Sequence, residues 1–403
     1  MASRRAAQQS NLDRYHCLFT WYRGFDRVDS KWMIDTLEDK LLTSDCEWQS
    51  IIYRLVLAFE NYHFHQYSVA RDHLVECENI LSDSECIATS PLVKRNEESI
   101  KHVLYSTWLH IIAKDHSYDT FEDYLKEIKL YKSMGARQRA GVNAIHAACL
   151  LEYGLKATKK SLDVILEAIK NNEHEGHWHY LKGQILRYER LSTCQSSPVL
   201  PKEQQSFEMA HFYDEHVPSH CIGLAACLHD SVKNVKGPSE VRDKATGLYK
   251  TALENWPNSA YVNLMCASGL LAYSYPVRET RLADKCIDKA LKLAPQSSHV
   301  NLVAGVFFKY PNHNNVAANR NFNIAKKRYS SIVEKIQKEE FENYRIILDK
   351  AITDPPQLPH VPAPAPAPVA NERVNVFDED VLSVYEQLNQ FADEDNYVIN
   401  YVF

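Results

Sequence analysis

Glycine is scarce in this sequence. Only 11 of the 403 residues are glycine, less than half of the roughly 7% found in average globular proteins. Dinucleotide-binding and P-loop folds need glycines to bring the backbone close to phosphates, and β-sandwiches need them in turns. The shortage therefore argues against all three classes.

Long apolar runs are absent as well. No stretch of about 18 apolar residues occurs, so we expect no transmembrane helix. The amino terminus reads MASRRAAQQS and no apolar segment follows it, so we expect no secretory signal. The ten cysteines show no CxxC pairing and lie among apolar residues, as in Ala148-Cys149-Leu150. Reduced, buried thiols and a cytoplasmic location are the prediction.

Catalytic motifs are also missing. The sequence holds no GxSxG, no HExxH, no Walker loop and no dinucleotide fingerprint. Its nearest metal-like group is HEGHWH, which contains His174, His177 and His179. No cysteine or carboxylate joins these histidines at ligand spacing, so we expect a polar helix start there. The sequence thus predicts no catalytic residue, no metal and no cofactor, and a protein that is not an enzyme.

Charge divides the chain into two parts. From Asp354 onward there are nine acidic residues and one arginine, a net charge of −8, so the rest of the chain carries +2. A nearly neutral body gives no overall attraction for nucleic acid, although a local basic groove remains possible. We expect no DNA partner and no membrane partner.

Helical periodicity dominates what is present. Apolar residues recur about every 3.6 positions in segments such as 48–63, 100–113, 121–131, 140–153 and 176–188. No segment alternates apolar and polar residues as a strand would. A weak tetratricopeptide (TPR) pattern also repeats after 38 residues, with its positions at Ala245, Tyr249, Ala252 and Pro257, then at Ala283, Ile287, Ala290 and Pro295. The small residues allow helices to approach closely, and the proline ends each unit.

These patterns predict an all-α, TPR-like α-solenoid or superhelix over residues 12–352, ending in a long charged helix around 319–352. Residues 1–11 are expected to be disordered. Residues 353–371 hold seven prolines alternating largely with alanine, which is typical of a semi-rigid linker. Residues 372–403 predict an acidic amphipathic helix. This tail would dock on the chain's own body, bind a partner, or remain unfolded.

A solenoid without catalytic groups usually binds a ligand along its inner face. Candidate lining residues are Lys182, Arg187, Tyr188, Arg190, Tyr249 and Tyr261. Arginines and tyrosines there could pair with phosphates and stack on bases. The same residues could equally be solvated or fill gaps between helices, and composition does not decide between these alternatives.

Further short segments carry a family resemblance. The opening Cys17-Leu18-Phe19-Thr20-Trp21, the helix start at 34–41, the first repeat at 53–78 and the segment 283–298 follow one another in order. Together with 148–154 and 183–191 they resemble the interferon-induced proteins with tetratricopeptide repeats over about residues 12–310.

The resemblance implies a cytosolic α-superhelix whose basic internal tunnel holds the 5′ end of single-stranded, non-self RNA in innate antiviral defence. It places Thr36 and Lys40 at the RNA end, Arg190 against a phosphate and Tyr261 in the tunnel. The sequence departs from the family pattern where a tunnel lysine is Glu152. It also departs at Leu264, Met265, Leu302 and Val303, and the later repeats of the family are missing.

Two functions therefore stand as hypotheses. The first is a non-enzymatic RNA-binding protein that uses Thr36, Lys40, Arg187, Arg190 and Tyr261 in a concave groove. The alternative is a TPR adaptor that binds an extended peptide in the groove and recruits a second protein through the acidic tail.

Overall fold

The structure is a computed structural model that describes residues 12–22, 29–44, 46–115, 118–193, 197–232, 239–272 and 279–338. The chain divides into a unit spanning 1–353 and a second spanning 354–403, and the described residues all belong to the first. The predicted amino-terminal segment 1–11, proline-rich linker and acidic tail lie outside them.

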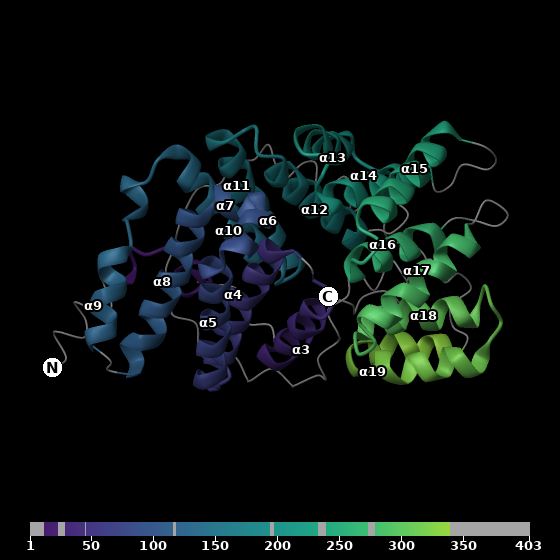
Figure 1. Ribbon diagram of the computed structural model, residues 1–403, viewed down its shortest axis with the longest axis horizontal. Helices are drawn as coiled ribbons and strands as arrows, with labels where there is room; N and C mark the ends of the chain where they lie inside the picture. Colours follow the sequence, from purple (N-terminus) through teal and green to yellow (C-terminus); the bar gives the residue numbers. More distant parts are fainter. Residues whose placement is uncertain are drawn as a thin grey trace, which may run out of the picture. The chain divides into compact units, whose positions relative to one another are not determined.

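The described residues form eighteen α-helices and one 3-10 helix, without a strand among them (Figure 1). In chain order these are α2 Leu18–Trp21, α3 Ser30–Leu41, α4 Glu47–His63, α5 Tyr67–Ser82, α6 Ser84–Thr89, α7 Pro91–Arg95, α8 Glu97–Asp115, α9 Tyr118–Glu127, η1 Tyr131–Ser133, α10 Ala136–Leu151, α11 Leu155–Asn171, α12 Gly176–Thr193, α13 Pro201–Tyr213, α14 Pro218–Ser231, α15 Glu240–Asn255, α16 Ala260–Leu271, α17 Thr280–Leu293, α18 Ser298–Lys309 and α19 Asn315–Gln337.

Consecutive helices pack as antiparallel pairs. The pairs are α4 with α5, α10 with α11, α12 with α13, α14 with α15, α16 with α17, and α18 with α19. The first helices of neighbouring pairs also touch, as α12 touches α14 and α14 touches α16. This arrangement of stacked helical hairpins is an α-solenoid, so the predicted fold class is confirmed.

The predicted 38-residue repeat recurs in the structure. Ala245, Ala252, Ala283 and Ala290 are all buried, as close helix contact requires. Helices α16 and α18 begin alike, because Ser259 caps the amide of Val262 and Ser297 caps that of Val300. The side chains of Asn263 and Asn301 also donate to equivalent carbonyls, those of Pro257 and Pro295. Short polar side chains therefore set the entry to each of these helices.

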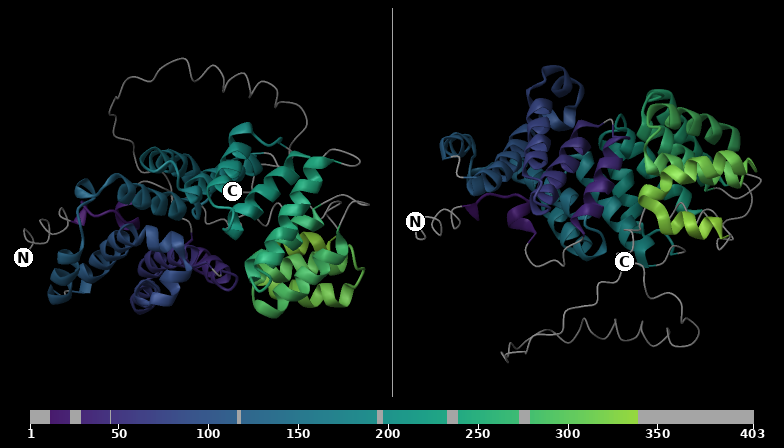
Figure 2. Two further views of the ribbon diagram at one scale, coloured as in Figure 1. Left: turned by 45° about the horizontal axis from the view of Figure 1, so that its top comes forward. Right: turned by 90° about the horizontal axis from the view of Figure 1, so that it is seen from below.

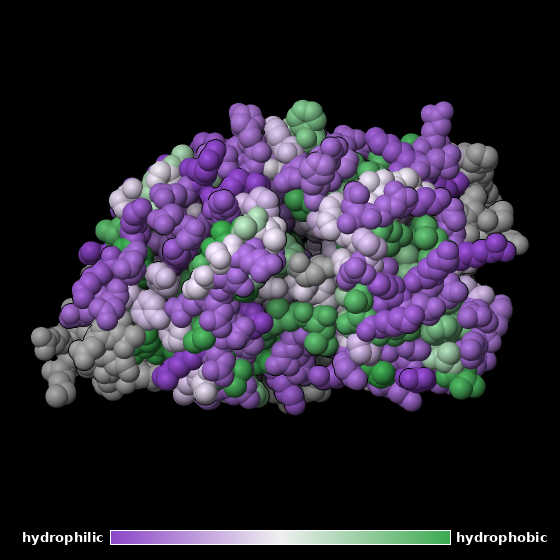
Figure 3. Space-filling view, in the orientation of Figure 1, coloured by the Kyte–Doolittle hydropathy of each residue, from purple (hydrophilic) through white to green (hydrophobic). Residues whose placement is uncertain are grey.

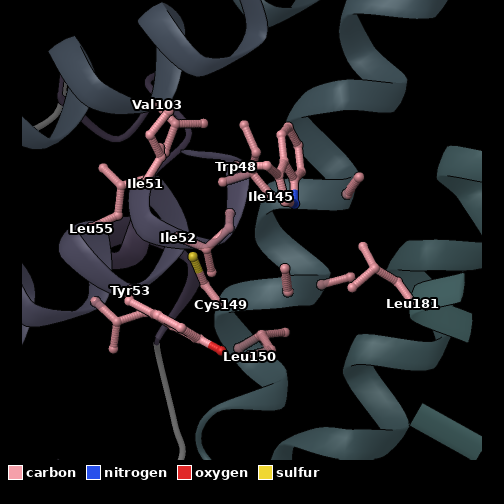
Figure 4. Packing of buried hydrophobic residues seen from close by; sticks show 14 of the residues in the cluster. Trp48, Ile51, Ile52, Tyr53, Leu55, Val103, Ile145, Cys149, Leu150 and Leu181 are labelled. Carbon is pink, nitrogen blue, oxygen red and sulfur yellow. The ribbon is translucent and has the colours of Figure 1, made fainter. Parts of the chain in front are cut away.

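Buried apolar side chains pack between the pairs in two large clusters, one running from Cys17 to Ala245 and the other from Cys221 to Ile336. In Figure 4, Trp48 and Ile52 of α4 lie beside Ile145 and Cys149 of α10, with Leu181 of α12 next along. The nine cysteines in the described part of the chain form no disulfide bond, and seven of them are buried. Burial of the Cys17 and Cys77 thiols raises the pKa of each to about 12. These thiols act as small apolar side chains.

Two helix ends differ from the prediction. The helix expected over 121–131 runs as α9 and ends at Glu127; beyond its end, the carbonyl of Lys129 bonds to the His102 ring at 2.9 Å. The last helix begins at Asn315, where Asn314 caps it, and is described to Gln337. Residues 339–352 of the predicted long helix lie outside the described part.

Helix α3, which precedes the first hairpin, meets the last described hairpin. Helix α3 lies beside α18 and α19 in the views of Figures 1 and 2, and Asp39 bonds to the first turn of α18.

The face of the molecule seen in Figure 3 is mostly hydrophilic, with apolar residues in small groups. Over the described ranges, no helix is both long and apolar enough to cross a bilayer.

Candidate functional site

Helix α3 brings Lys40 to a carboxylate and an aromatic ring. The Lys40 ammonium donates to Glu152 at the end of α10 and lies 5.5 Å from the ring centroid of Tyr53 on α4. Burial raises the pKa of Tyr53 well above its usual value, and the Glu152 carboxylate raises it further. The tyrosine therefore stays neutral, and Glu152 is the charged partner of Lys40.

Tyr180 of α12 continues this polar group toward α16. Burial raises the pKa of Tyr180, and hydrogen bonds to Tyr261 and Gln184 oppose that shift. Tyr261, Met265 and Gly269 are partly exposed and four residues apart, so they form one stripe along α16. Tyr53, Tyr180 and Tyr261 thus come together from three hairpins far apart in sequence.

Arg187 and Arg190 lie further along α12. Arg187 donates to Asp230 of α14 at 3.2 Å. Arg190 makes two bonds of 2.8 Å to Glu203 of α13 and a third of 2.8 Å to Asp230. Only 1% of the Arg190 side chain is exposed, so its charge is held inside the protein.

The two guanidinium groups act on Asp230. Burial alone would raise its pKa, but Arg187 and Arg190 outweigh burial and hold the pKa of this carboxyl well below its usual range. A buried charge that lost these partners would be strongly destabilising. The Arg190 network is therefore a structural brace of α12, α13 and α14, with Arg187 at its less enclosed end.

A small cavity opens at this end. Arg187, Asp230, Ile222, Met265 and Gly269 are among its lining residues, and its volume is about 30 Å³. A water molecule needs roughly 10–15 Å³ of such space, so the cavity is large enough for one or two waters but not for a nucleotide. A larger ligand would lie across the mouth, against Arg187 and the α16 stripe.

We call Lys40, Tyr53, Tyr180, Arg187 and Tyr261 the central site. Its cations are matched by carboxylates, Lys40 by Glu152 and Arg187 by Asp230. The buried neighbours Arg190 and Arg328 likewise pair with Glu203 and Asp39. The resemblance implies a basic tunnel, whereas these eight charges sum to zero.

The structure places the five predicted site residues in two groups. Thr36 and Lys40 lie one turn apart on α3, and Thr36 is only 2% exposed. Arg187, Arg190 and Tyr261 belong to the α12–α16 side, which Tyr180 links to Tyr53 and Lys40. Of the other candidate liners, Tyr249 is buried in the core.

Sequence reasoning missed three contributors. Tyr53 and Tyr180 were absorbed into helix-packing patterns, since an aromatic residue within an apolar stripe is typical of a core position. Arg328 lay in a segment predicted as a long charged helix with no assigned contact, and it reaches Asp39. No local pattern in the sequence signalled these contacts, because each joins helices that are far apart along the chain.

The histidines near residue 174 also differ from prediction. His177 is buried, and its ring lies against that of His220, with Nδ1 and Nε2 3.3 Å apart. A helix does start here, since α12 begins at Gly176, but His177 is buried instead of lying on the polar surface. Among the described residues, no group of three or more metal-ligating side chains comes together.

The fold and site define a TPR-like helical-repeat protein with a polar inner site. No protein-family profile matches the sequence, and no curated protein matches it. Among solved structures, the chain is similar to a human IFIT1 dimer with m7Gppp-AAAA (15% identity, TM-score 0.45, covering 86% of this chain and 84% of that one). A human IFIT1 dimer with PPP-AAAA gives 15% identity and a TM-score of 0.42 over 85% and 84%. A monomeric IFIT1 mutant with Gppp-AAAA gives 15% identity and a TM-score of 0.45, covering 85% of each chain. Likeness at this level establishes neither a family nor a ligand.

Proposed function

We propose that this protein is a non-enzymatic, RNA-binding helical-repeat protein whose central site holds single-stranded RNA. The observation that carries the proposal is the convergence of three tyrosines with Lys40 and Arg187 from helices α3, α4, α12 and α16. Tyr261 is the partly exposed ring of the three and can stack on a base, cations beside it can hold the backbone, and the buried Tyr53 and Tyr180 rings pack behind them. Rigid helices keep these groups in place.

The paired charges shape the expected binding mode. A phosphate that approaches Lys40 or Arg187 competes with Glu152 or Asp230, so each contact gains less than a free cation would give. Affinity then depends more on stacking than on counterion release, and salt weakens it less than at a basic site. The role in innate antiviral defence, the preference for 5′ ends and the cytoplasmic location belong to this proposal and rest on the family resemblance.

Equilibrium binding of fluorescent single-stranded RNA tests the proposal. The ligands are 5′-triphosphate, capped and 5′-hydroxyl oligomers of one sequence, measured from about 50 to about 200 mM salt. We expect binding at low salt, with an affinity loss over this range far below the roughly thousandfold loss of a site with six or more free phosphate contacts. Absence of RNA binding at low salt would contradict the proposal.

Three substitutions localise the binding. Tyr261→Ala removes a stacking surface and should weaken binding by roughly fivefold to 150-fold, since a stacked base is worth about 1–3 kcal/mol. Arg187→Met should weaken it less. Glu152→Gln releases Lys40 and should strengthen binding and steepen the salt dependence.

Matched controls lie on outer helices. Tyr67 on α5 and the exposed Arg281 on α17 lie outside the central site, so Tyr67→Ala and Arg281→Met should leave affinity unchanged. If both controls weaken binding as much as the site variants, the RNA lies elsewhere. A protein partner that survives nuclease and is lost with Tyr261→Ala would support the peptide-binding adaptor instead.

A further inference from the structure

One contact joins the two ends of the described helical array. The Asp39 carboxylate on α3 accepts hydrogen bonds from the backbone amides of Ser298 and His299 and from the Ser297 hydroxyl. These residues form the first turn of α18, at least 258 positions further along the chain. Amides in the first turn of a helix have no partner within the helix, so Asp39 supplies one from a distant element.

A second group reaches the same carboxylate. Arg328 of α19 lies with Nη1 3.7 Å from Asp39 Oδ2. The α19 backbone leaves helical geometry at the next residue, Tyr329, with φ −112° and ψ 39°. The Tyr329 ring lies 4.8 Å from the Arg328 guanidinium. The kink therefore coincides with the residues that face α3.

Some buried polar atoms at this contact lack hydrogen-bond partners. Within the part of the chain that the structure describes, four buried polar atoms here have no hydrogen-bond partner: Thr36 Oγ1, Ser298 Oγ, Arg328 Nε and Tyr329 OH. Unpartnered buried groups of this kind oppose closure. Opening the contact would let water reach the atoms that line it, which favours release.

We propose that Asp39, the first turn of α18 and Arg328 form a reversible junction that controls access to the central site, with Asp39 as its positioning residue. Lys40 and Thr36 share helix α3 with Asp39, so the position of α3 sets theirs. A ligand held by Lys40 favours the closed junction, and the closed junction in turn strengthens ligand binding. This coupling rests on the proposed function, whereas the junction itself does not.

Hydrogen exchange of the full-length protein measures the junction directly. The amides of Ser298 and His299 are protected by Asp39, so a peptide covering 297–301 reports its state. In Asp39→Asn we expect these amides to exchange roughly tenfold to a hundredfold faster, as the loss of charge-assisted bonds implies. Glu38→Gln removes an exposed acid from the same helix and should change nothing.

The equivalent peptide at the start of α16 serves as an internal reference. Asp39→Asn should leave the exchange of 259–263 unchanged, which separates local opening from general unfolding. If Asp39→Asn does not fold, Arg328→Gln keeps the carboxylate but removes its ion pair, and should raise exchange at 297–301 by a smaller factor. Unchanged exchange at 297–301 in whichever variant folds would overturn the junction.

A second measurement tests the coupling. In the unmodified protein, single-stranded RNA should slow exchange at 297–301, and Asp39→Asn should release RNA faster than the unmodified protein does. If RNA binds but neither effect occurs, the junction does not control the site. If RNA does not bind at all, the proposed function and the coupling fail together, while exchange without RNA still decides whether the junction opens.

Discussion

Histidines of α8 and α10 that pack against residues 12–22 are buried in neutral form. The His146 ring stacks on Trp21 with centroids 4.2 Å apart, and His16 stacks on Tyr131 at 4.2 Å. Burial lowers the pKa of His146 to about 3 and that of His102 to about 4. It also lowers the pKa of His16. These rings act as flat packing groups that hold residues 12–22 against α8 and α10.

Their low pKa values predict acid sensitivity. Below about pH 6.5 these histidines bind protons in the unfolded chain but stay neutral in the folded protein. The free energy of unfolding therefore falls from that pH toward pH 4. His146→Phe keeps a ring and removes one such site. Between about pH 8 and about pH 5 the variant should lose about 2 kcal/mol less unfolding free energy than the unmodified protein does.

Urea unfolding at the two pH values measures this effect. His174→Phe replaces an exposed histidine (74% of the side chain) and should leave the pH dependence as it is. An equal slope for His146→Phe and the unmodified protein would contradict the assignment of His146 as a buried neutral ring.

At the scale of helices, close approach depends on single glycines. A Cβ added at Gly269 of α16 would lie 2.3 Å from the hydroxyl of Tyr249 on α15, and Tyr249 is only 1% exposed. A Cβ at Gly247 of α15 would meet nothing within 4 Å. Packing therefore excludes a side chain at Gly269, whereas Gly247 has room for one.

The pair gives a matched stability test. Gly269→Ala should lower the free energy of unfolding by about 1–3 kcal/mol, because Tyr249 is enclosed and must shift. Gly247→Ala should raise it by about 0.5–1 kcal/mol through helix propensity. Thermal and urea unfolding of both variants measure the difference. Equal effects would mean that α15 and α16 are not packed as described.

The features that could be predicted from the sequence are those set by residue spacing within one helical hairpin. The spacing of Ala245, Ala252, Ala283 and Ala290 is a property of one helix and its neighbour, and it predicted the hairpins correctly. Pairing of Arg190 with Glu203 and Asp230, or of Asp39 with Ser298, depends on how hairpins stack. No short-range pattern encodes such contacts, so the charge balance of the site was beyond prediction.

At the scale of the described unit, the ends of the helical array and the central site are connected through α3. Asp39 faces α18 while its neighbour Lys40 pairs with Glu152 of α10 and lies over Tyr53 of α4. One helix therefore belongs both to the closing contact and to the site. We expect binding to follow from this arrangement of side chains rather than from any reactive group.

Photo-crosslinking tests this expectation most directly. Single-stranded RNA carrying 4-thiouridine is bound to the full-length protein and irradiated, and the attached peptides are identified by mass spectrometry. We predict crosslinks in peptides that contain Tyr261 or Lys40, the more exposed members of the central site, reduced when Tyr261 is replaced by alanine. Crosslinks confined to second helices such as α11 and α17, or none at all, would contradict binding at the central site.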